Sequence, residues 1–147
     1  MALEVRRFAA ATRTAADAAR EIGTDVARIV KSLVFAIDGR PIVVLCAGDN
    51  RVSLRRLEEI FRASTVRQAT ADEAKRWTGF AIGGVPPFAH AGEVQVVVDE
   101  TLARFHTVWA AAGLPDAVFE ISVDDLARLS RATSAAVAAV PGTEWER

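Results

Sequence analysis

The sequence predicts a mixed α/β domain, of the α+β kind, in which helices pack around a mixed or antiparallel sheet. Helix-like and strand-like patterns alternate along the chain. Two apolar runs, residues 33–37 and 42–47, flank the turn signal Asp38-Gly39, which predicts a β-hairpin and argues against a purely parallel sheet. With 147 residues, 51% of them hydrophobic, the chain has the size of one domain, residues 1–147, and can bury a core without disulfides.

The region before the hairpin is predicted to be helical. Thr14 and Asp17 form a capping box that opens an Ala-rich helix, and Gly23 ends it. Apolar side chains recur at helical spacing over residues 26–30, so a second helix is expected to continue through Ser32 and to lead into the first hairpin strand.

After the hairpin, Ser53 is expected to cap a helix with an inward apolar face made of Leu54, Leu57, Ile60 and Phe61. Residues 66–69 read as a short strand. Thr70 and Glu73 then form a second capping box, which opens a helix that runs through Trp77 and ends at Gly79.

The C-terminal half is predicted to hold three strands and one helix. Residues 80–82 form a brief strand that the Gly/Pro segment 83–87 interrupts, and the apolar runs 94–98 and 118–121 are the other two. Ser122 and Asp125 form a third capping box, for a helix that contains Leu126 and Leu129.

Composition excludes several classes of protein. A net charge of −1 excludes a globally basic nucleic-acid-binding protein. One cysteine and two histidines cannot build a Cys/His zinc site, and no cofactor is expected, although the count leaves carboxylate-rich metal sites open. The chain has neither an apolar stretch of membrane-spanning length nor a signal-peptide core, so a cytoplasmic protein without membrane contact is expected.

Charge is uneven along the chain. Residues 51–76 carry seven basic and four acidic side chains. Ordinary polar helix faces explain such an excess, and so does a surface that contacts a phosphate backbone.

Three features stand out as candidates for chemistry. Lys31 is expected at a helix-to-strand junction between buried segments, where its ammonium group needs a ligand or carboxylate, unless it reaches water or the helix C-terminus. The loop 83–87 has two glycines and two prolines, so it is either a stiff loop whose Gly84 and Val85 N–H groups bind a carbonyl or oxyanion, or a simple turn. His90 follows it as a general acid or base, or as a structural residue.

Four segments carry a family resemblance: TRTA at 12–15, IVKSLVF at 29–35, GDNR at 48–51 and TGFAIGGVPP at 78–87. Together they resemble the YbaK/prolyl-tRNA synthetase-associated domain family, over roughly residues 5–140. Its members include free-standing aminoacyl-tRNA deacylases and the editing domain inserted in bacterial prolyl-tRNA synthetases. The resemblance implies a mixed, largely antiparallel sheet or partial barrel surrounded by helices.

The resemblance also implies an activity, namely trans-editing: hydrolysis of the ester that links a wrong amino acid to a tRNA. The expected substrate is tRNA-Pro carrying a small amino acid such as alanine or 2-aminobutyrate, with a prolyl-tRNA synthetase as a candidate partner and the oligomeric state open. Ser32 stands where alanine-specific relatives often carry asparagine, so cysteine, serine and threonine also remain candidates for the edited amino acid.

By the same resemblance, Lys31 corresponds to a lysine needed for activity, and Gly83 and Pro87 frame the loop that holds the aminoacyl end. We expect Lys31 to bind the terminal phosphate or polarise the ester carbonyl, and a ribose hydroxyl of the substrate to activate the water. The apolar residues Ile82, Val85 and Phe88 would then set the pocket size. The expected site residues are, as catalytic groups, Lys31, Gly84, Val85 and His90; as substrate-binding groups, Ser32, Asp49, Asn50, Ile82, Gly83, Pro86, Pro87 and Phe88; and as tRNA contacts, Arg51, Arg55 and Arg56.

Two other functions compete with deacylation. One is a non-catalytic module that binds an aminoacyl-tRNA or a synthetase. The other is an unrelated enzyme in which Lys31 forms a Schiff base, which requires a desolvated lysine.

Overall fold

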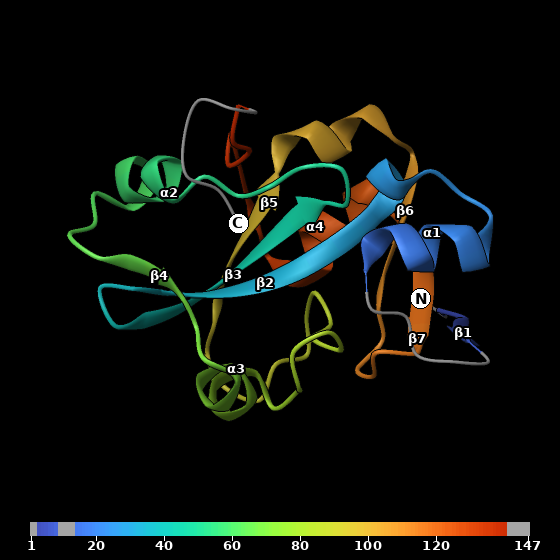
Figure 1. Ribbon diagram of the computed structural model, residues 1–147, viewed down its shortest axis with the longest axis horizontal. Coiled ribbons are helices and arrows are strands. Elements are labelled where there is room, and N and C mark those ends of the chain that lie inside the picture. The colour runs from blue at the N-terminus through green and yellow to red at the C-terminus, as the bar shows by residue number, and fades with distance from the viewer. Residues whose placement is uncertain (1–2, 9–13, 141–147) are drawn as a thin grey trace.

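The computed structural model describes residues 3–8 and 14–140. In this part of the chain the strands form one eight-stranded sheet in the order β1-β7-β6-β2-β3-β5-β8, with β4 paired to β2 beside this path (Figure 1). The strands are β1 (Val5–Arg7), β2 (Ile29–Ile37), β3 (Arg40–Ala47), β4 (Val66–Gln68), β5 (Gln95–Asp99), β6 (Thr107–Ala111), β7 (Ala117–Ser122) and β8 (Thr133–Ala135). The helices are α1 (Ala15–Ile22), α2 (Leu54–Phe61), α3 (Ala71–Thr78) and α4 (Val123–Ser130), with the 3₁₀ turns η1 (Val26–Arg28) and η2 (Glu100–Arg104).

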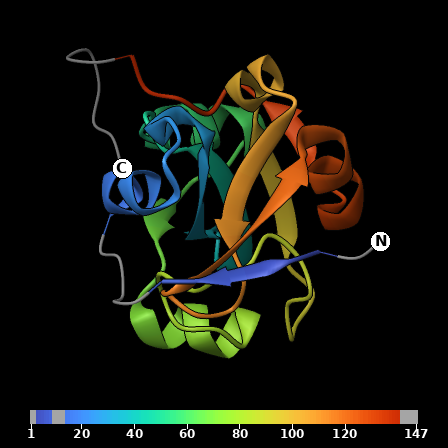
Figure 2. The ribbon, with the colours of Figure 1, turned by 90° about the vertical axis from the view of Figure 1, so that its right-hand side faces the viewer.

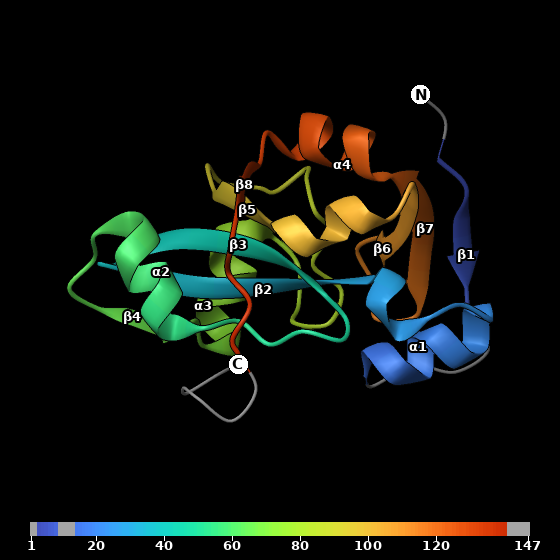
Figure 3. The same ribbon diagram turned by 90° about the horizontal axis from the view of Figure 1, so that it is seen from above.

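The sheet is mixed, as the sequence predicts. β2 pairs antiparallel with β3 and β4, and β7 pairs antiparallel with β1 and β6. The pairs β2–β6, β3–β5 and β5–β8 are parallel. The helices α1 and α4 lie on opposite sides of the sheet (Figures 2 and 3), so the predicted mixed α/β class is confirmed.

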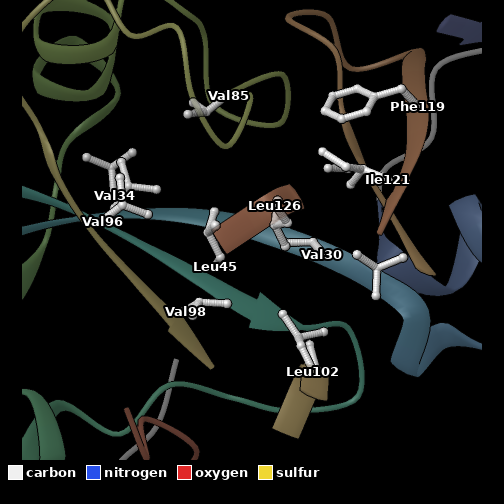
Figure 4. Close-up of a cluster of buried hydrophobic side chains, with 14 of the residues drawn as sticks. Val30, Val34, Leu45, Val85, Val96, Val98, Leu102, Phe119, Ile121 and Leu126 are labelled. Carbon is white, nitrogen blue, oxygen red and sulfur yellow. The ribbon is translucent and has the colours of Figure 1, made fainter. Parts of the chain in front are cut away.

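Alternation along the central strands divides the core between the two faces. On one face, Val30 and Val34 of β2 pack in a buried cluster with residues of η2 and α4 (Figure 4). On the other face, Phe35 and Ile37 pack with Leu57 of α2. Both faces of β2 are thus covered, which explains why the sequence shows a continuous apolar run there rather than an alternating pattern.

The predicted capping residues are confirmed. Thr14, Thr70 and Ser122 each accept a hydrogen bond from the backbone N–H three residues on, and Thr70 forms the full reciprocal box with Glu73. Ser53 likewise caps α2, although Ile60 of that helix is 41% exposed and does not face inward as predicted. No helix in the described part of the chain is long and apolar enough to cross a membrane.

The predicted second helix is wrong. Only Val26–Arg28 forms a 3₁₀ turn, and β2 begins at Ile29. The apolar residues over 26–30 fit either structure, and pairing with both β3 and β6 decides in favour of the strand. The brief strand predicted at residues 80–82 is also absent, because that segment is part of a loop without a strand partner among the described residues.

Candidate active site

The sheet has an opening next to β2. Among the described strands, β6 pairs with β2 at Ile29 and Val30 and then turns away, while β4 begins to pair only at Phe35. Residues 31–34 therefore have a registered partner on one side alone, in β3. A pocket of about 580 Å³ lies at this opening.

The pocket walls come from five parts of the chain. They are the start of α1, β2, the loop after β3, the loop after α3, and the β6–β7 hairpin with its turn. The lining residues that matter for the site are Lys31, Ser32, Asp49, Asn50, Arg51, Ile82, Gly83, Val85 and Trp109. Eight of these nine were predicted as site residues, and Trp109 was not. Of the matched segment at 12–15, residues 12 and 13 lie outside the described residues.

Lys31 lies within β2, opposite Cys46 of β3, and not at the helix-to-strand junction expected from the sequence. Its side chain is partly buried, and its Nζ donates a hydrogen bond to the backbone carbonyl of Asn50. This bond uses one of the three ammonium donors and holds the charge at the pocket wall.

The loop after β3 that contains Asn50 (the Asn50 loop) is held in place by Asp99, at the end of β5. The Asp99 carboxylate accepts hydrogen bonds from Ala47 N at 3.1 Å and Asn50 Nδ2 at 2.9 Å. It also accepts from the N–H and hydroxyl groups of Thr101. Burial raises the pKa of Asp99, but these hydrogen bonds outweigh it and hold the pKa below its ordinary value. Asp99 is therefore a buried, ionised anchor for the loop that supports Lys31.

Asp49 and Arg51 flank this anchor at the surface. Asp49 forms an ion pair with Arg104 at 3.2 Å, and Arg104 also stacks on the ring of Phe105. Arg51 is exposed and lines the pocket, three residues before α2 begins. The pocket rim thus carries both signs of charge.

The loop after α3 is fixed by its own hydrogen bonds and by one buried side chain. Val85 is 2% exposed and packs into the cluster shown in Figure 4. Gly84 lies so close to the β6–β7 turn that an added Cβ would meet backbone atoms of Gly113 and Leu114 at 3.0 Å. The loop is therefore packed tightly against its neighbours, and its two prolines further restrict its backbone.

The structure does not bring every predicted loop residue to the pocket. The Gly84 N–H donates to the carbonyl of Ala81 at 3.0 Å, so it is already engaged in a turn and is not available for an oxyanion. Pro86 and Pro87 are buried outside the lining. Phe88 packs against Phe119, with ring centroids 5.8 Å apart.

His90 also lies outside the pocket lining. Its Nε2–H group donates to the carbonyl of Pro86 at 2.7 Å. Burial lowers the pKa of His90, and this hydrogen bond opposes the shift only in part. A neutral imidazole that ties the loop to itself is a structural histidine, which is one of the two roles expected from the sequence.

Ile82 lies at the mouth of the pocket and is 55% exposed, whereas Gly83 and Val85 lie further along the same loop. An apolar side chain that is exposed at a pocket rim is placed to contact a ligand that extends out of the pocket. Arg55 and Arg56, on the first turn of α2, do not line the pocket.

Neither a reactive cysteine nor a metal-binding cluster is found among the described residues. Burial raises the pKa of the Cys46 thiol to about 12, so this cysteine is a protonated core residue and not a nucleophile. The described residues contain no group of three or more histidine, cysteine, aspartate or glutamate side chains that could hold a metal ion.

Sequence reasoning missed the Asp99 anchor. A signal for it exists, because Asp99 ends an apolar strand and is followed two residues later by Thr101, the pattern of an aspartate that caps a turn. Nothing in the sequence shows that the same carboxylate also reaches the loop after β3.

Comparison with known proteins identifies the family of this chain. The sequence profile of the aminoacyl-tRNA editing domain matches residues 9–129. The chain belongs to the aminoacyl-tRNA editing domain family. As a member of it, the chain is an aminoacyl-tRNA deacylase, which confirms the family resemblance and the enzyme class expected from the sequence.

Three relatives illustrate the match. An uncharacterized protein, YwhH of Bacillus subtilis (strain 168), is 33% identical over 128 residues, which cover 86% of this chain and 81% of that protein. The proline–tRNA ligase of Lactobacillus helveticus (strain DPC 4571) is 30% identical over 102 residues, which cover 69% of this chain but 18% of the ligase. A crystal structure described as a presumed trans-editing enzyme for prolyl tRNA synthetase superimposes with a TM-score of 0.89 at 39% identity, over 94% of this chain and 87% of that one.

Proposed function

We propose that this editing domain acts in trans on tRNA-Pro that carries a small non-cognate amino acid. The observation that carries the proposal is the placement of Lys31: its ammonium group is fixed on the Asn50 carbonyl at the wall of a pocket lined with small and apolar residues. The relation to a proline–tRNA ligase and to a described trans-editing enzyme supports tRNA-Pro as the tRNA.

The reaction is hydrolysis of an activated ester. A water oxygen adds to the ester carbonyl carbon, the bond from that carbon to the ribose oxygen breaks, and the ribose oxygen takes a proton. The products are the free amino acid and a tRNA with a free terminal hydroxyl group. Because the ester is already reactive, positioning and charge stabilisation suffice for catalysis. Among the described residues that line the pocket, the one carboxylate is that of Asp49, and it is paired with Arg104. This pairing favours activation of the water by a ribose hydroxyl of the substrate.

Lys31 provides the positive charge for this step. Two of its three ammonium donors remain after the bond to Asn50, and they can bind the ester carbonyl oxygen or the terminal phosphate. Among the loop amides predicted to complete the oxyanion site, Gly84 is engaged and Val85 is the one that lines the pocket.

The tRNA backbone is proposed to run along the basic start of α2. Arg51 lines the pocket, and Arg55 and Arg56 follow it in sequence on the first turn of α2. Basic side chains close to the pocket in sequence suit the phosphates next to an ester bound there. A prolyl-tRNA synthetase remains a candidate partner of this complex.

The decisive experiment measures deacylation of tRNA-Pro charged with alanine, 2-aminobutyrate, cysteine, serine, threonine or proline. Wild-type protein is compared with Lys31→Ala and with Lys75→Ala, which removes the other lysine of the chain, on the exposed face of α3. We expect selective hydrolysis of non-cognate esters, a loss of about 100-fold or more in Lys31→Ala, and no change in Lys75→Ala.

Two results would contradict the proposal. Folded wild-type protein that binds charged tRNA without hydrolysing any ester would favour the binding-module alternative. Equal activity of the two lysine variants would remove Lys31 from the mechanism.

A further inference from the structure

Ser32 is a pocket residue with unused hydrogen-bonding groups. Its Oγ is buried and has no hydrogen-bond partner among the described residues. Buried polar groups are nearly always paired in proteins, and one that is left unpaired costs about 1–3 kcal/mol. Ser32 therefore marks a position in the pocket wall where a polar group lacks a protein partner.

The main chain of Ser32 is unpaired as well. Val34 accepts a hydrogen bond from Ala69 N on the side of β2 that faces away from β3. Peptide groups alternate in direction along a strand, so the N–H and C=O groups of Ser32 face this same side. There, pairing with β6 has ended at Val30 and pairing with β4 has not begun, and no other described residue bonds to them.

Ser32 therefore presents its N–H donor and its C=O acceptor to the opening, separated as they are in any strand residue. In an antiparallel pair, two facing residues exchange both of their N–H and C=O bonds. An aminoacyl ester with a free α-amino group has the matching set: an ammonium donor and a carbonyl acceptor on the two sides of one Cα.

We infer that the aminoacyl group of the substrate pairs with the main chain of Ser32 as a single added strand residue. The α-ammonium donates to the Ser32 carbonyl, and the ester carbonyl accepts from the Ser32 N–H. This inference rests on the proposed function and deepens it, because it names the substrate groups that the site recognises, the α-ammonium group and the ester carbonyl, and the protein groups that bind them.

The pairing also supplies the oxyanion donor that the engaged Gly84 amide cannot. When water adds to the ester carbonyl, the negative charge develops on the oxygen that the Ser32 N–H already holds. A fixed donor at that position is worth about 100- to 1,000-fold in kcat.

The first test varies the substrate on one tRNA. Alanyl, lactyl and propionyl esters carry an ammonium group, a hydroxyl group or hydrogen at the α position. If the panel selects another amino acid, the same three types of that amino acid are used. Each enzymatic kcat/KM is divided by the spontaneous hydrolysis rate of the same ester, because the ammonium group also activates the ester chemically.

We expect this ratio to fall about 10- to 100-fold from alanyl to propionyl, with lactyl between them because its hydroxyl still donates. Equal ratios for alanyl and propionyl would overturn the pairing while leaving the deacylase function intact. Hydrolysis of none of the esters by folded protein would refute the proposed function itself, and the pairing with it.

The second test separates main chain from side chain. Ser32→Pro removes the N–H group that faces the opening. It breaks no hydrogen bond to β3, so the strand can accommodate the proline, as edge strands do. Ser32→Ala removes the hydroxyl and keeps both main-chain groups. We expect the kcat of Ser32→Pro to lie about 100-fold or more below that of Ser32→Ala, because only the proline variant lacks the N–H group.

A folded Ser32→Pro variant with the kcat of wild type would overturn the inference, and thermal melting establishes that the variant is folded. If the proline variant does not fold, the ester series decides alone.

Discussion

Replacing Asp99 by asparagine is expected to loosen the loop that supports Lys31. The two carboxylate oxygens accept four hydrogen bonds, from Ala47 N, Asn50 Nδ2, and the N–H and hydroxyl groups of Thr101. Asparagine has the same shape but one acceptor oxygen. Its NH₂ group must therefore face a backbone N–H, of Ala47 in one orientation or of Thr101 in the other.

Either orientation leaves one N–H group unpaired, that of Ala47 being buried and that of Thr101 partly buried, at a cost of about 1–3 kcal/mol. The bonds to the remaining oxygen also lose the charge that strengthens them, which adds about 1 kcal/mol. The sum is about 2–4 kcal/mol, and for a protein of this size each kcal/mol lowers Tm by roughly 2–4 °C or somewhat more. We therefore expect a fall in Tm of roughly 5–15 °C for Asp99→Asn.

Thermal unfolding followed by circular dichroism measures the loss, and deacylation by the folded variant measures the effect on the site. Asp72→Asn, on the exposed first turn of α3, is the matched control. A fall of less than 2 °C in the Tm of Asp99→Asn, with unchanged activity, would refute the reasoning, since it would show that these hydrogen bonds do not hold the loop.

Three further outcomes are expected. Gly48→Ala places a Cβ 2.2 Å from the Val26 carbonyl oxygen and 3.0 Å from a second backbone oxygen. The turn η1 must then move, at a cost of about 1–3 kcal/mol, which should lower Tm. An unchanged Tm would mean that this turn shifts freely. Arg55→Glu should weaken tRNA binding and flatten its dependence on salt, whereas the control Arg131→Glu at the end of α4 should not, and equal effects of the two would argue against a tRNA path along α2. The pKa of Asp99 in the folded protein lies below its unfolded value of about 3.9. The ionised carboxylate therefore stabilises the fold fully above about pH 3.9, and this stabilisation is lost as the pH falls through the folded pKa. The Tm of the wild type should fall more steeply below about pH 4 than the Tm of Asp99→Asn, and parallel curves would contradict this account.

Local interactions explain what could be predicted from the sequence alone. The capping residues Thr14, Thr70 and Ser122 were correct because the hydrogen bond that each makes spans three residues. The hairpin was correct because Asp38-Gly39 forms its turn and the two flanking apolar runs pair directly. The family motifs also singled out Lys31 and the loops after β3 and α3, and residues of all three line one pocket.

The tertiary structure decided what these local signals leave open. Residues 26–30 satisfy a helical pattern, yet β2 starts at Ile29 because β6, about 80 residues further along the chain, pairs with it there. That pairing ends after Val30, and its end creates both the opening at Ser32 and the pocket beside it. Asp99 reaches the Asn50 loop for the same kind of reason, since β5 lies next to β3. Hydrogen bonds between distant strands depend on which segments become neighbours in the sheet, and spacing along the chain does not specify that.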